Sequence, residues 1–256
     1  MLILGIDLEG MSEDLVGNGV NLNLDRVTEI GAVLWDTRID APIQIFSELT
    51  KERDMLPLSE EVIELTGIDE QLLVDHGLKG DEIRDALEKL SLLMKRADFL
   101  MAHNGEKYDK PMLGAMYKRF GLVMPEKTWI DTQEDIEYPR KISHKSMAAL
   151  EHAHGFINPF PHRAVTDVLS MLKIASHYDY KRMARLASSP KVKIVANLRA
   201  PNWKDKGQVE KFNKVKNKVS RARFRWDASS KEWYKIVHRL HIDEGVLTFD
   251  FDWSIS

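Results

Sequence analysis

The sequence predicts an α/β protein with a mixed five-stranded sheet flanked by helices, followed by a small α+β C-terminal domain. Three early apolar runs read as strands, and helical and strand-like segments then alternate, which favours a mixed sheet covered by helices. The sign of the charge also reverses along the chain. Residues 1–189 hold 22 Lys and Arg against 32 Asp and Glu, whereas residues 190–256 hold 15 against 8. We therefore expect a large acidic domain over 1–189 and a small basic module over 190–256.

The strands of the large domain are short runs rich in β-branched and aromatic residues. The run at 26–35, RVTEIGAVLW, is the strongest example, and turn-prone Gly17-Asn18-Gly19 separates it from the first run. The expected strands cover residues 2–8, 26–35, 44–49, 98–102 and 129–132.

The helices are predicted from apolar residues that recur every three to four positions. Residues 81–96 are the clearest case, because Ile83, Leu87, Leu90 and Met94 share one stripe. The other helices are expected to begin at Ser59 and to cover 108–120, 146–154 and 163–177. In the C-terminal module we expect a strand at 191–198, a lysine-rich helix at 206–219 and a hairpin that turns at 228–231.

Composition excludes several kinds of chemistry. The chain has no cysteine, which rules out disulfides, thiolate nucleophiles and Cys-ligated zinc. Any metal site must use carboxylates and histidines, which favours hard divalent cations. No apolar run approaches the roughly 20 residues that span a bilayer, and no secretory signal is visible, so we expect a cytoplasmic protein without a membrane partner.

Asp7 and Glu9 form the first candidate site. They lie two residues apart at the end of the first strand, so their side chains point to the same face. Two carboxylates this close repel each other unless a positive charge lies between them. A bound cation would satisfy the pair, although a D-x-E pair alone could equally face solvent.

Asp109, His162 and Asp167 extend the set. Asp109 belongs to the turn that leads into the helix at 108–120, where an acidic residue in the first helical turn is also ordinary. Pro161 favours a helix start near Arg163, which places Asp167 on the helix and His162 on the loop before it. A rigid metal ligand and a more mobile general base suit those two positions.

The order of these motifs resembles the DEDDh branch of the DnaQ-like 3′–5′ exonuclease superfamily, which has an RNase H-like fold. D-x-E at Asp7, N-x-x-x-[FY]-D at Asn104 and H-x-x-x-x-D at His162 match its three exonuclease motifs in order. Thr28-Glu29-Ile30, Leu65-Thr66-Gly67-Ile68 and Ile130-Asp131-Thr132 also look like segments of that family. The resemblance covers roughly residues 1–178.

The resemblance implies a two-metal hydrolysis of phosphodiester bonds that releases nucleoside 5′-monophosphates. In this reading Asp7, Glu9, Asp109 and Asp167 hold two Mg²⁺ ions, for which Mn²⁺ substitutes, and His162 accepts a proton from the attacking water. The expected substrate is nucleic acid with a free 3′ end, with single-stranded DNA favoured. The alternatives are a 3′–5′ exoribonuclease and a catalytically idle DnaQ-like subunit that binds nucleic acid or serves proofreading. The sequence does not identify a partner in replication or repair.

The resemblance also indicates substrate contacts, which we expect at Leu8, Gly10, Met11, Asn104 and Tyr108. The family usually follows D-x-E with a run such as Thr-Thr-Gly that holds the terminal nucleotide, whereas this chain has Gly10-Met11-Ser12. Packing is an equal alternative for Tyr108. The way in which the 3′ end is held therefore differs from the family pattern.

In the C-terminal module, Arg221, Arg223 and Arg225 are expected to alternate along one strand and to share a face, with Phe224 and Trp226 on the other. Interleaved arginines and aromatics suit contacts to nucleic acid. The competing interpretation is that the aromatics form a small core and that the arginines are solvated.

Overall fold

The structure is a computed structural model that describes residues 1–11 and 20–256, without the side chain of Met11. The turn predicted at Gly17–Gly19 lies outside the described residues. The chain divides into two compact units, residues 1–187 and 188–256, each with its own hydrophobic core.

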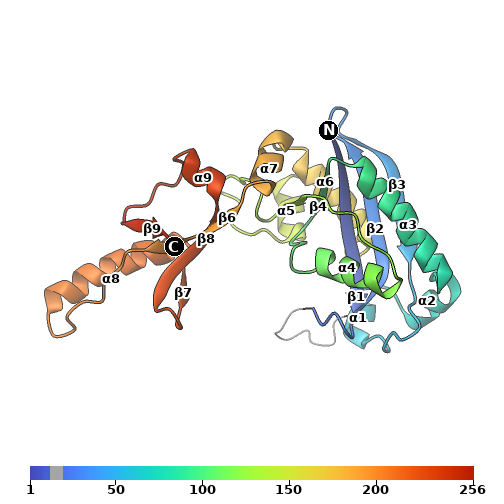
Figure 1. The fold of residues 1–256 in the computed structure, drawn as a ribbon, viewed down its shortest axis with the longest axis horizontal. Helices are drawn as coiled ribbons and strands as arrows, with labels where there is room; N and C mark the ends of the chain where they lie inside the picture. Colours follow the sequence, from blue (N-terminus) through green and yellow to red (C-terminus); the bar gives the residue numbers. More distant parts are fainter. Residues whose placement is uncertain (12–19) are drawn as a thin grey trace. The chain divides into compact units, whose positions relative to one another are not determined.

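The first unit is built on a five-stranded sheet in the order β3-β2-β1-β4-β5 (Figure 1). The pairs β1–β2 and β2–β3 are antiparallel, whereas β1–β4 and β4–β5 are parallel. The strands are β1 (Leu2–Met11), β2 (Arg26–Asp36), β3 (Ala41–Leu49), β4 (Phe99–Ala102) and β5 (Trp129–Asp131). The expected mixed sheet is confirmed, and each predicted strand overlaps an observed one.

Helices cover both faces of this sheet. They are α1 (Glu60–Thr66), α2 (Glu70–His76), α3 (Asp81–Arg96), α4 (Asp109–Arg119), α5 (Met147–Ala153), α6 (Ala164–Ala175) and α7 (Tyr180–Ala187). Ser59 caps α1 as its position suggested, with its hydroxyl accepting a hydrogen bond from Val62 N. The sequence analysis did not predict α2 or α7, which have seven and eight residues and are therefore shorter than the windows over which helical periodicity is read.

Alternation along β1 separates two cores. Leu4, Ile6 and Leu8 point to a cluster shared with α3 and α4, whereas Ile3 belongs to a second cluster with α6 and α7. Every residue of β2 is buried, because this strand has neighbours on both edges and helices on both faces. Asp7 and Glu9 follow Ile3 in the period-2 pattern and therefore lie on the α6 face.

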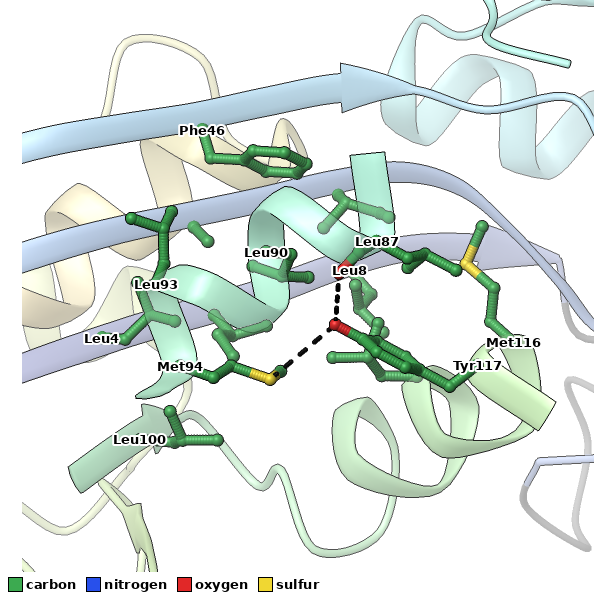
Figure 2. Close-up of a cluster of buried hydrophobic side chains, with 14 of the residues drawn as sticks. Leu4, Leu8, Phe46, Leu87, Leu90, Leu93, Met94, Leu100, Met116 and Tyr117 are labelled. Atoms are coloured by element: carbon green, nitrogen blue, oxygen red, sulfur yellow. Dashed lines mark hydrogen bonds between the residues drawn. The ribbon is translucent and has the colours of Figure 1, made fainter. Parts of the chain in front are cut away.

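The first cluster is shown in Figure 2. The predicted stripe of α3 is buried there, and α3 begins and ends where the sequence predicted. Tyr117 of α4 is the largest fully buried side chain, and its hydroxyl donates a hydrogen bond of 2.9 Å to the carbonyl oxygen of Leu87. Burial of each large apolar side chain contributes about 1.5–3 kcal/mol, so this core fixes α4 against the sheet.

The second unit is a four-stranded antiparallel sheet in the order β7-β8-β6-β9. Its elements are β6 (Lys191–Ala196), α8 (Lys206–Arg221), β7 (Arg225–Asp227), β8 (Glu232–His238), α9 (Arg239–Asp243) and β9 (Trp253–Ile255). The strand, the lysine-rich helix and the hairpin were predicted, while the short α9 and β9 were not.

The prediction that Arg221, Arg223 and Arg225 share one strand is wrong. Arg221 is the last residue of α8, Arg223 has a left-handed φ of 61°, and only Arg225 belongs to β7. The helix continues through Arg221 and ends in a turn in which Phe224 N donates to the carbonyl oxygen of Val219, while the Phe224 side chain is buried in the core of the unit. Alternation therefore begins only after Phe224.

Among the helices of the described residues, none is both long enough and apolar enough to cross a membrane.

Candidate active site

The first turn of α6 lies unusually close to β2. A Cβ atom built on Gly31 would stand 2.3 Å from the carbonyl carbon of Ala164, which is shorter than any real contact with backbone. Gly31 is thus required for close approach and not for an unusual φ. The approach brings Asp167 of α6 over the strands that carry the D-x-E pair.

An ion pair between the half-buried Arg163 and the buried Glu29 holds the same helix end. Arg163 donates to both carboxylate oxygens of Glu29, with distances of 3.0 and 2.9 Å, and Ala164 N donates to Glu29 Oε2 at 3.1 Å. Glu29 therefore acts as the cap of α6, whose own N-cap residue, Arg163, makes no side-chain capping bond. Glu29 is only 1% exposed and stands opposite Glu9 in the β1–β2 register.

Three of the predicted residues converge. Glu9, His162 and Asp167 each offer a ligand atom, and these atoms all lie within 4.8 Å of one another. Glu9 comes from β1, Asp167 from α6 and His162 from the loop before α6. Among the described residues, these three side chains form the group of His, Asp and Glu residues whose spacing suits a metal ion.

The positions of His162 and Asp167 are coupled. His162 N donates to Asp167 Oδ2 at 3.0 Å, and Asn158 Nδ2 donates to Asp167 Oδ1 at 2.6 Å. His162 is exposed and has a left-handed φ of 61°. The carboxylate is therefore oriented by two donors, while the imidazole is open to solvent.

Asp109 approaches from the other side of β1. It is the first residue of α4, is 2% exposed, and accepts a hydrogen bond of 3.1 Å from Leu8 N through Oδ1. The last residue of β1 paired with β4 is Gly5, so the Leu8 amide lies beyond that ladder. Asp109 and Asp7 are outside the group of three, but charge interactions connect them to it.

Burial raises the pKa of every carboxyl in this set, and repulsion from the other site carboxylates raises it further for Asp7 and Glu9. Burial, followed by the charge of Asp167, raises the pKa of Glu9 to about 8. Burial also raises the pKa of Asp109 to about 8. The pKa of Asp7 lies well above its usual range because of burial and then the charge of Asp109, and burial raises the pKa of Asp167.

This donor set fits hard divalent cations. Carboxylate oxygens are the ligands that Mg²⁺ and Mn²⁺ prefer, and a cation would relieve the repulsion that raises these pKa values. The one basic side chain that lowers the pKa of Glu9, Arg163, is itself bonded to Glu29.

The residues predicted to contact substrate lie in three different environments. The Leu8 side chain is 3% exposed in the α3–α4 core, so any contact with a nucleotide would fall to its backbone. Gly10 leaves no room for a side chain, because a Cβ there would stand 2.8 Å from the Tyr108 hydroxyl. Tyr108 is half-buried against the same core. The side chain of Met11 lies outside the described residues.

Asn104 holds the loop after β4. It has a left-handed φ of 64°, a conformation that asparagine adopts more readily than most residues. Its N–H donates to Asp131 Oδ1 at 3.1 Å, which ties this loop to the end of β5. Asn104 thus anchors the segment that leads to Asp109.

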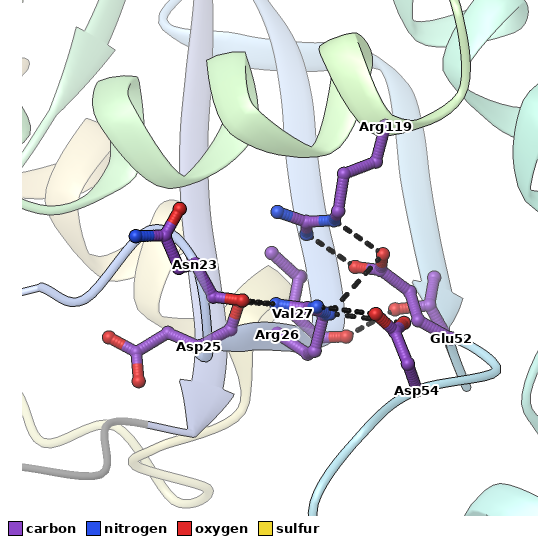
Figure 3. Close-up of polar contacts among 8 residues, drawn as sticks. Asn23, Asp25, Arg26, Val27, Glu52, Asp54 and Arg119 are labelled. Carbon is purple, nitrogen blue, oxygen red and sulfur yellow. Dashed lines mark hydrogen bonds and ion pairs between the residues drawn. The ribbon is translucent and has the colours of Figure 1, made fainter.

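A buried ionic network fixes the start of β2 beside Gly10 and Met11 (Figure 3). The Arg26 guanidinium lies 2.7 Å from Asp54 and 3.7 Å from Glu52, and it donates to the carbonyl oxygen of Asn23 at 3.0 Å. Arg119, in the last turn of α4, donates to both oxygens of Glu52 at 2.6 Å. The network connects α4 to the strand that pairs with the end of β1.

The motif-based interpretation missed Glu29, Asn158 and Arg163 as parts of the site. The available signal was Glu29 itself, a charged residue directly before the apolar run at 30–35 of a strand that is expected to be buried, since a buried charge requires a partner. The partner, Arg163, is 134 residues away in sequence, and nothing in the sequence identifies it.

Similarity to known proteins agrees with this geometry. Residues 4–175 match the RNase T family, described as exonucleases. No curated protein sequence matches the chain. Among solved structures, the nuclease domain of 3′hExo, a DEDDh family member bound to rAMP, superposes with a TM-score of 0.55 at 19% identity, covering 69% of this chain and 90% of that one.

Two further structures share the fold. A 3′-exonuclease that recognises the 3′ end of a histone mRNA stem-loop has a TM-score of 0.55 at 19% identity, over 69% of this chain and 80% of that one. The zinc-bound E. coli ExoI–ssDNA complex has a TM-score of 0.58 at 14% identity, over 77% of this chain and 48% of that one. The chain thus spans about half of ExoI. Because residues 4–175, well over half of the chain, match this family, the chain belongs to the exonuclease family RNase T.

Proposed function

We propose that this chain is a metal-dependent 3′–5′ exonuclease of the DEDDh branch. It removes nucleoside 5′-monophosphates from the 3′ end of single-stranded nucleic acid, with DNA favoured. The observation that carries the proposal is the convergence of Glu9, His162 and Asp167 within 4.8 Å, with the buried Asp109 bonded to the backbone of the same strand.

Asp7, Glu9, Asp109 and Asp167 would hold two divalent cations. Bound there, the ions would neutralise the charge that develops on the phosphate and on the leaving 3′ oxygen. The raised pKa values support this role, because a site that repels its own negative charge gains most from binding a cation.

His162 would accept the proton of the attacking water. Its imidazole is exposed, so water reaches it, and histidine is the side chain that most often serves as a general base. Its backbone bond to Asp167 keeps the ring beside the carboxylates. Asn158 donates to the other oxygen of Asp167, and the remaining lone pairs of that carboxylate would be available to hold a cation.

The second candidate is a 3′–5′ exoribonuclease with the same site. It is supported by two structures with the same fold, one bound to the ribonucleotide rAMP and one of a 3′-exonuclease that recognises a histone mRNA stem-loop. The ExoI complex with ssDNA supports the DNA substrate in the same way. Hydrolysis is the same for both polymers, so only the sugar contacts would discriminate between them.

The decisive assay uses single strands of DNA and RNA with identical sequence, each labelled in turn at the 5′ and the 3′ end, with Mg²⁺, Mn²⁺ or EDTA. A 3′–5′ enzyme gives a descending ladder from the 5′ label and immediate mononucleotide from the 3′ label. The faster polymer identifies the substrate. A protein that binds both strands but releases no mononucleotide with either metal would instead be the idle subunit.

Asp167→Ala is the test variant, and Asp85→Ala is its matched control. Asp85 is also a helix-borne aspartate, but it is exposed on α3. Asp167→Ala should lose activity by at least a thousandfold, since metal-ligand removal abolishes the charge neutralisation on which the reaction depends. Asp85→Ala should retain it. Full activity in Asp167→Ala would refute the assigned site.

A further inference from the structure

We infer that residues 199–231 of the second unit form a binding surface for single-stranded nucleic acid, on which basic side chains contact the phosphates and Trp203 and Trp226 stack with bases. This inference rests on the proposed function for the class of polymer that the chain meets. It replaces the single arginine face expected from the sequence with a surface that runs from the loop before α8 through α8 to the β7–β8 hairpin.

The positive charge of the second unit is concentrated in this segment. Residues 199–231 contain eleven Lys and Arg against three Asp and Glu, whereas residues 232–256 contain two against five. The eleven basic side chains are all exposed, namely Arg199, Lys204, Lys206, Lys211, Lys214, Lys216, Lys218, Arg221, Arg223, Arg225 and Lys231. A field of this sign attracts a polyanion and releases its counterions.

Only part of this charge is neutralised locally. Lys214 lies 2.8 Å from Glu210, one helical turn away, and Lys218 lies 3.8 Å from Asp250. Exposed pairs of this kind are worth about 0–1 kcal/mol and are easily exchanged for phosphate contacts. The segment therefore keeps a large positive excess at its surface.

The same segment carries the two exposed tryptophans of the chain. Trp203 is 68% exposed and Trp226 is 50% exposed, whereas the other four are buried or half-buried. Each lies against a second aromatic ring, Phe212 in an edge-to-face pair with Trp203 and Trp233 in a tilted pair with Trp226, with ring centroids 5.7 Å apart in both pairs. A supported ring with a free face is the usual platform for an unpaired base.

A cleft of about 740 Å³ adjoins the second pair. Its lining combines two basic residues, two acidic residues, one aromatic residue and the residues at the end of β6, namely Arg199, Lys231, Glu232, Asp252, Trp233 and Val195 to Leu198. Glu232 pairs with Lys193 at 3.1 Å, while the carbonyl oxygen of Asp252 accepts from Asn197 N at 2.9 Å. Arg199 and Lys231 thus lie beside the Trp233 ring in a concave site that suits a nucleotide.

The chemistry favours nucleic acid over an acidic protein. An acidic peptide would satisfy the lysines and arginines, but it would leave the exposed indole faces without a partner. Single-stranded nucleic acid supplies phosphates and flat rings together, and its bases, unlike those of a duplex, are free to stack.

The test measures the binding of fluorescein-labelled oligo(dT) of 20 nucleotides to the full chain by anisotropy, in EDTA and over a series of NaCl concentrations. The charge variant is Lys211→Gln with Lys216→Gln, and its matched control is Lys191→Gln, an exposed lysine outside the segment. The double variant should reduce the slope of log Kd against log salt by about 0.7 per lysine, while the control keeps the wild-type slope.

The stacking variants are Trp226→Leu, which keeps an apolar side chain, and Trp203→Ala. Each should raise Kd about five- to hundredfold with little change in the salt slope. An abasic oligomer of the same length should bind the wild type as weakly as the variants bind oligo(dT). Thermal unfolding of each variant confirms that it is folded.

Unchanged Kd in both tryptophan variants, equal binding of the abasic oligomer, or an equal effect of Lys191→Gln would overturn the inference. So would displacement of oligo(dT) by polyglutamate at equal charge concentration. Asp167→Ala, measured in parallel, should bind oligo(dT) like the wild type. A chain that binds as expected but never cleaves would refute the proposed function alone, and one that cleaves while every variant binds normally would refute this inference alone.

Discussion

Glu29→Gln tests how the first turn of α6 is positioned. The substitution preserves size and one acceptor oxygen but removes the negative charge opposite Arg163 and at the start of α6. The position is sensitive because Glu29 is almost fully buried and because α6 carries Asp167, while His162 immediately precedes Arg163. A change at Glu29 is thus expected to act on the site without touching a metal ligand.

Three contributions set the size of the effect. Hydrogen bonds to charged groups contribute about 1.5–3 kcal/mol each, but Arg163 is 39% exposed in its side chain and can turn to water, which reduces its loss. The cap of Ala164 N contributes about 1 kcal/mol. Removing the charge also relieves the repulsion between Glu29 and Glu9, and this contribution stabilises the variant. We expect a net loss of about 2 kcal/mol, equivalent to about 4–8 °C in Tm.

Thermal unfolding and nuclease kinetics measure the two consequences. Glu29→Gln should lower kcat about ten- to hundredfold, because a small displacement of a catalytic group is enough to reduce the rate this much. A double-mutant cycle with Arg163→Gln should give a coupling energy of about 1–3 kcal/mol. An unchanged Tm together with unchanged kcat, or a coupling energy near zero, would refute the role assigned to this ion pair.

Three other perturbations give distinct outcomes. In EDTA the Tm should fall as pH rises from about 4.5 to about 8, because the raised pKa of Glu9 means that the folded chain holds a proton that the unfolded chain has lost. Mg²⁺ should remove most of this pH dependence. A Tm that does not change with pH in EDTA would contradict the prediction. His162→Asn, which tolerates the left-handed backbone, should lower kcat about 10²- to 10⁴-fold with unchanged Tm, and retained kcat would exclude the general base. Gly31→Ala should cost about 3 kcal/mol by denaturant unfolding and reduce activity, whereas a wild-type midpoint would show that α6 moves freely.

The sequence predicted those parts of the site that depend on local geometry. Period-2 alternation placed Asp7 and Glu9 on one face of β1 without knowledge of what lies opposite. Pro161 likewise predicted a helix start between His162 and Asp167, and α6 begins at Ala164. The fold class followed because apolar periodicity is a property of each segment by itself.

Features that depend on distant contacts could not be predicted. Glu29 and Arg163 are joined only when α6 packs on β2, which Gly31 permits through the absence of a side chain. In the second unit, the sequence predicted a strand that already includes Arg221 and Arg223. The local sequence does not show that α8 continues through Arg221 or that Phe224 is buried behind it. Tertiary packing decided both cases.

The charges around β1 explain why the site would depend on a cation from outside. Arg163 is the basic side chain that acts on Glu9, but its guanidinium is bonded to Glu29, which stands opposite Glu9 in the next strand. The positive charge of Arg163 is therefore already engaged in holding α6. Asp7 and Glu9 are still repelled by the neighbouring carboxylates of the site, and burial disfavours the charged form of Asp109 and Asp167 as well. If a basic side chain neutralised them from within the fold, the site would be more stable and would bind cations less well.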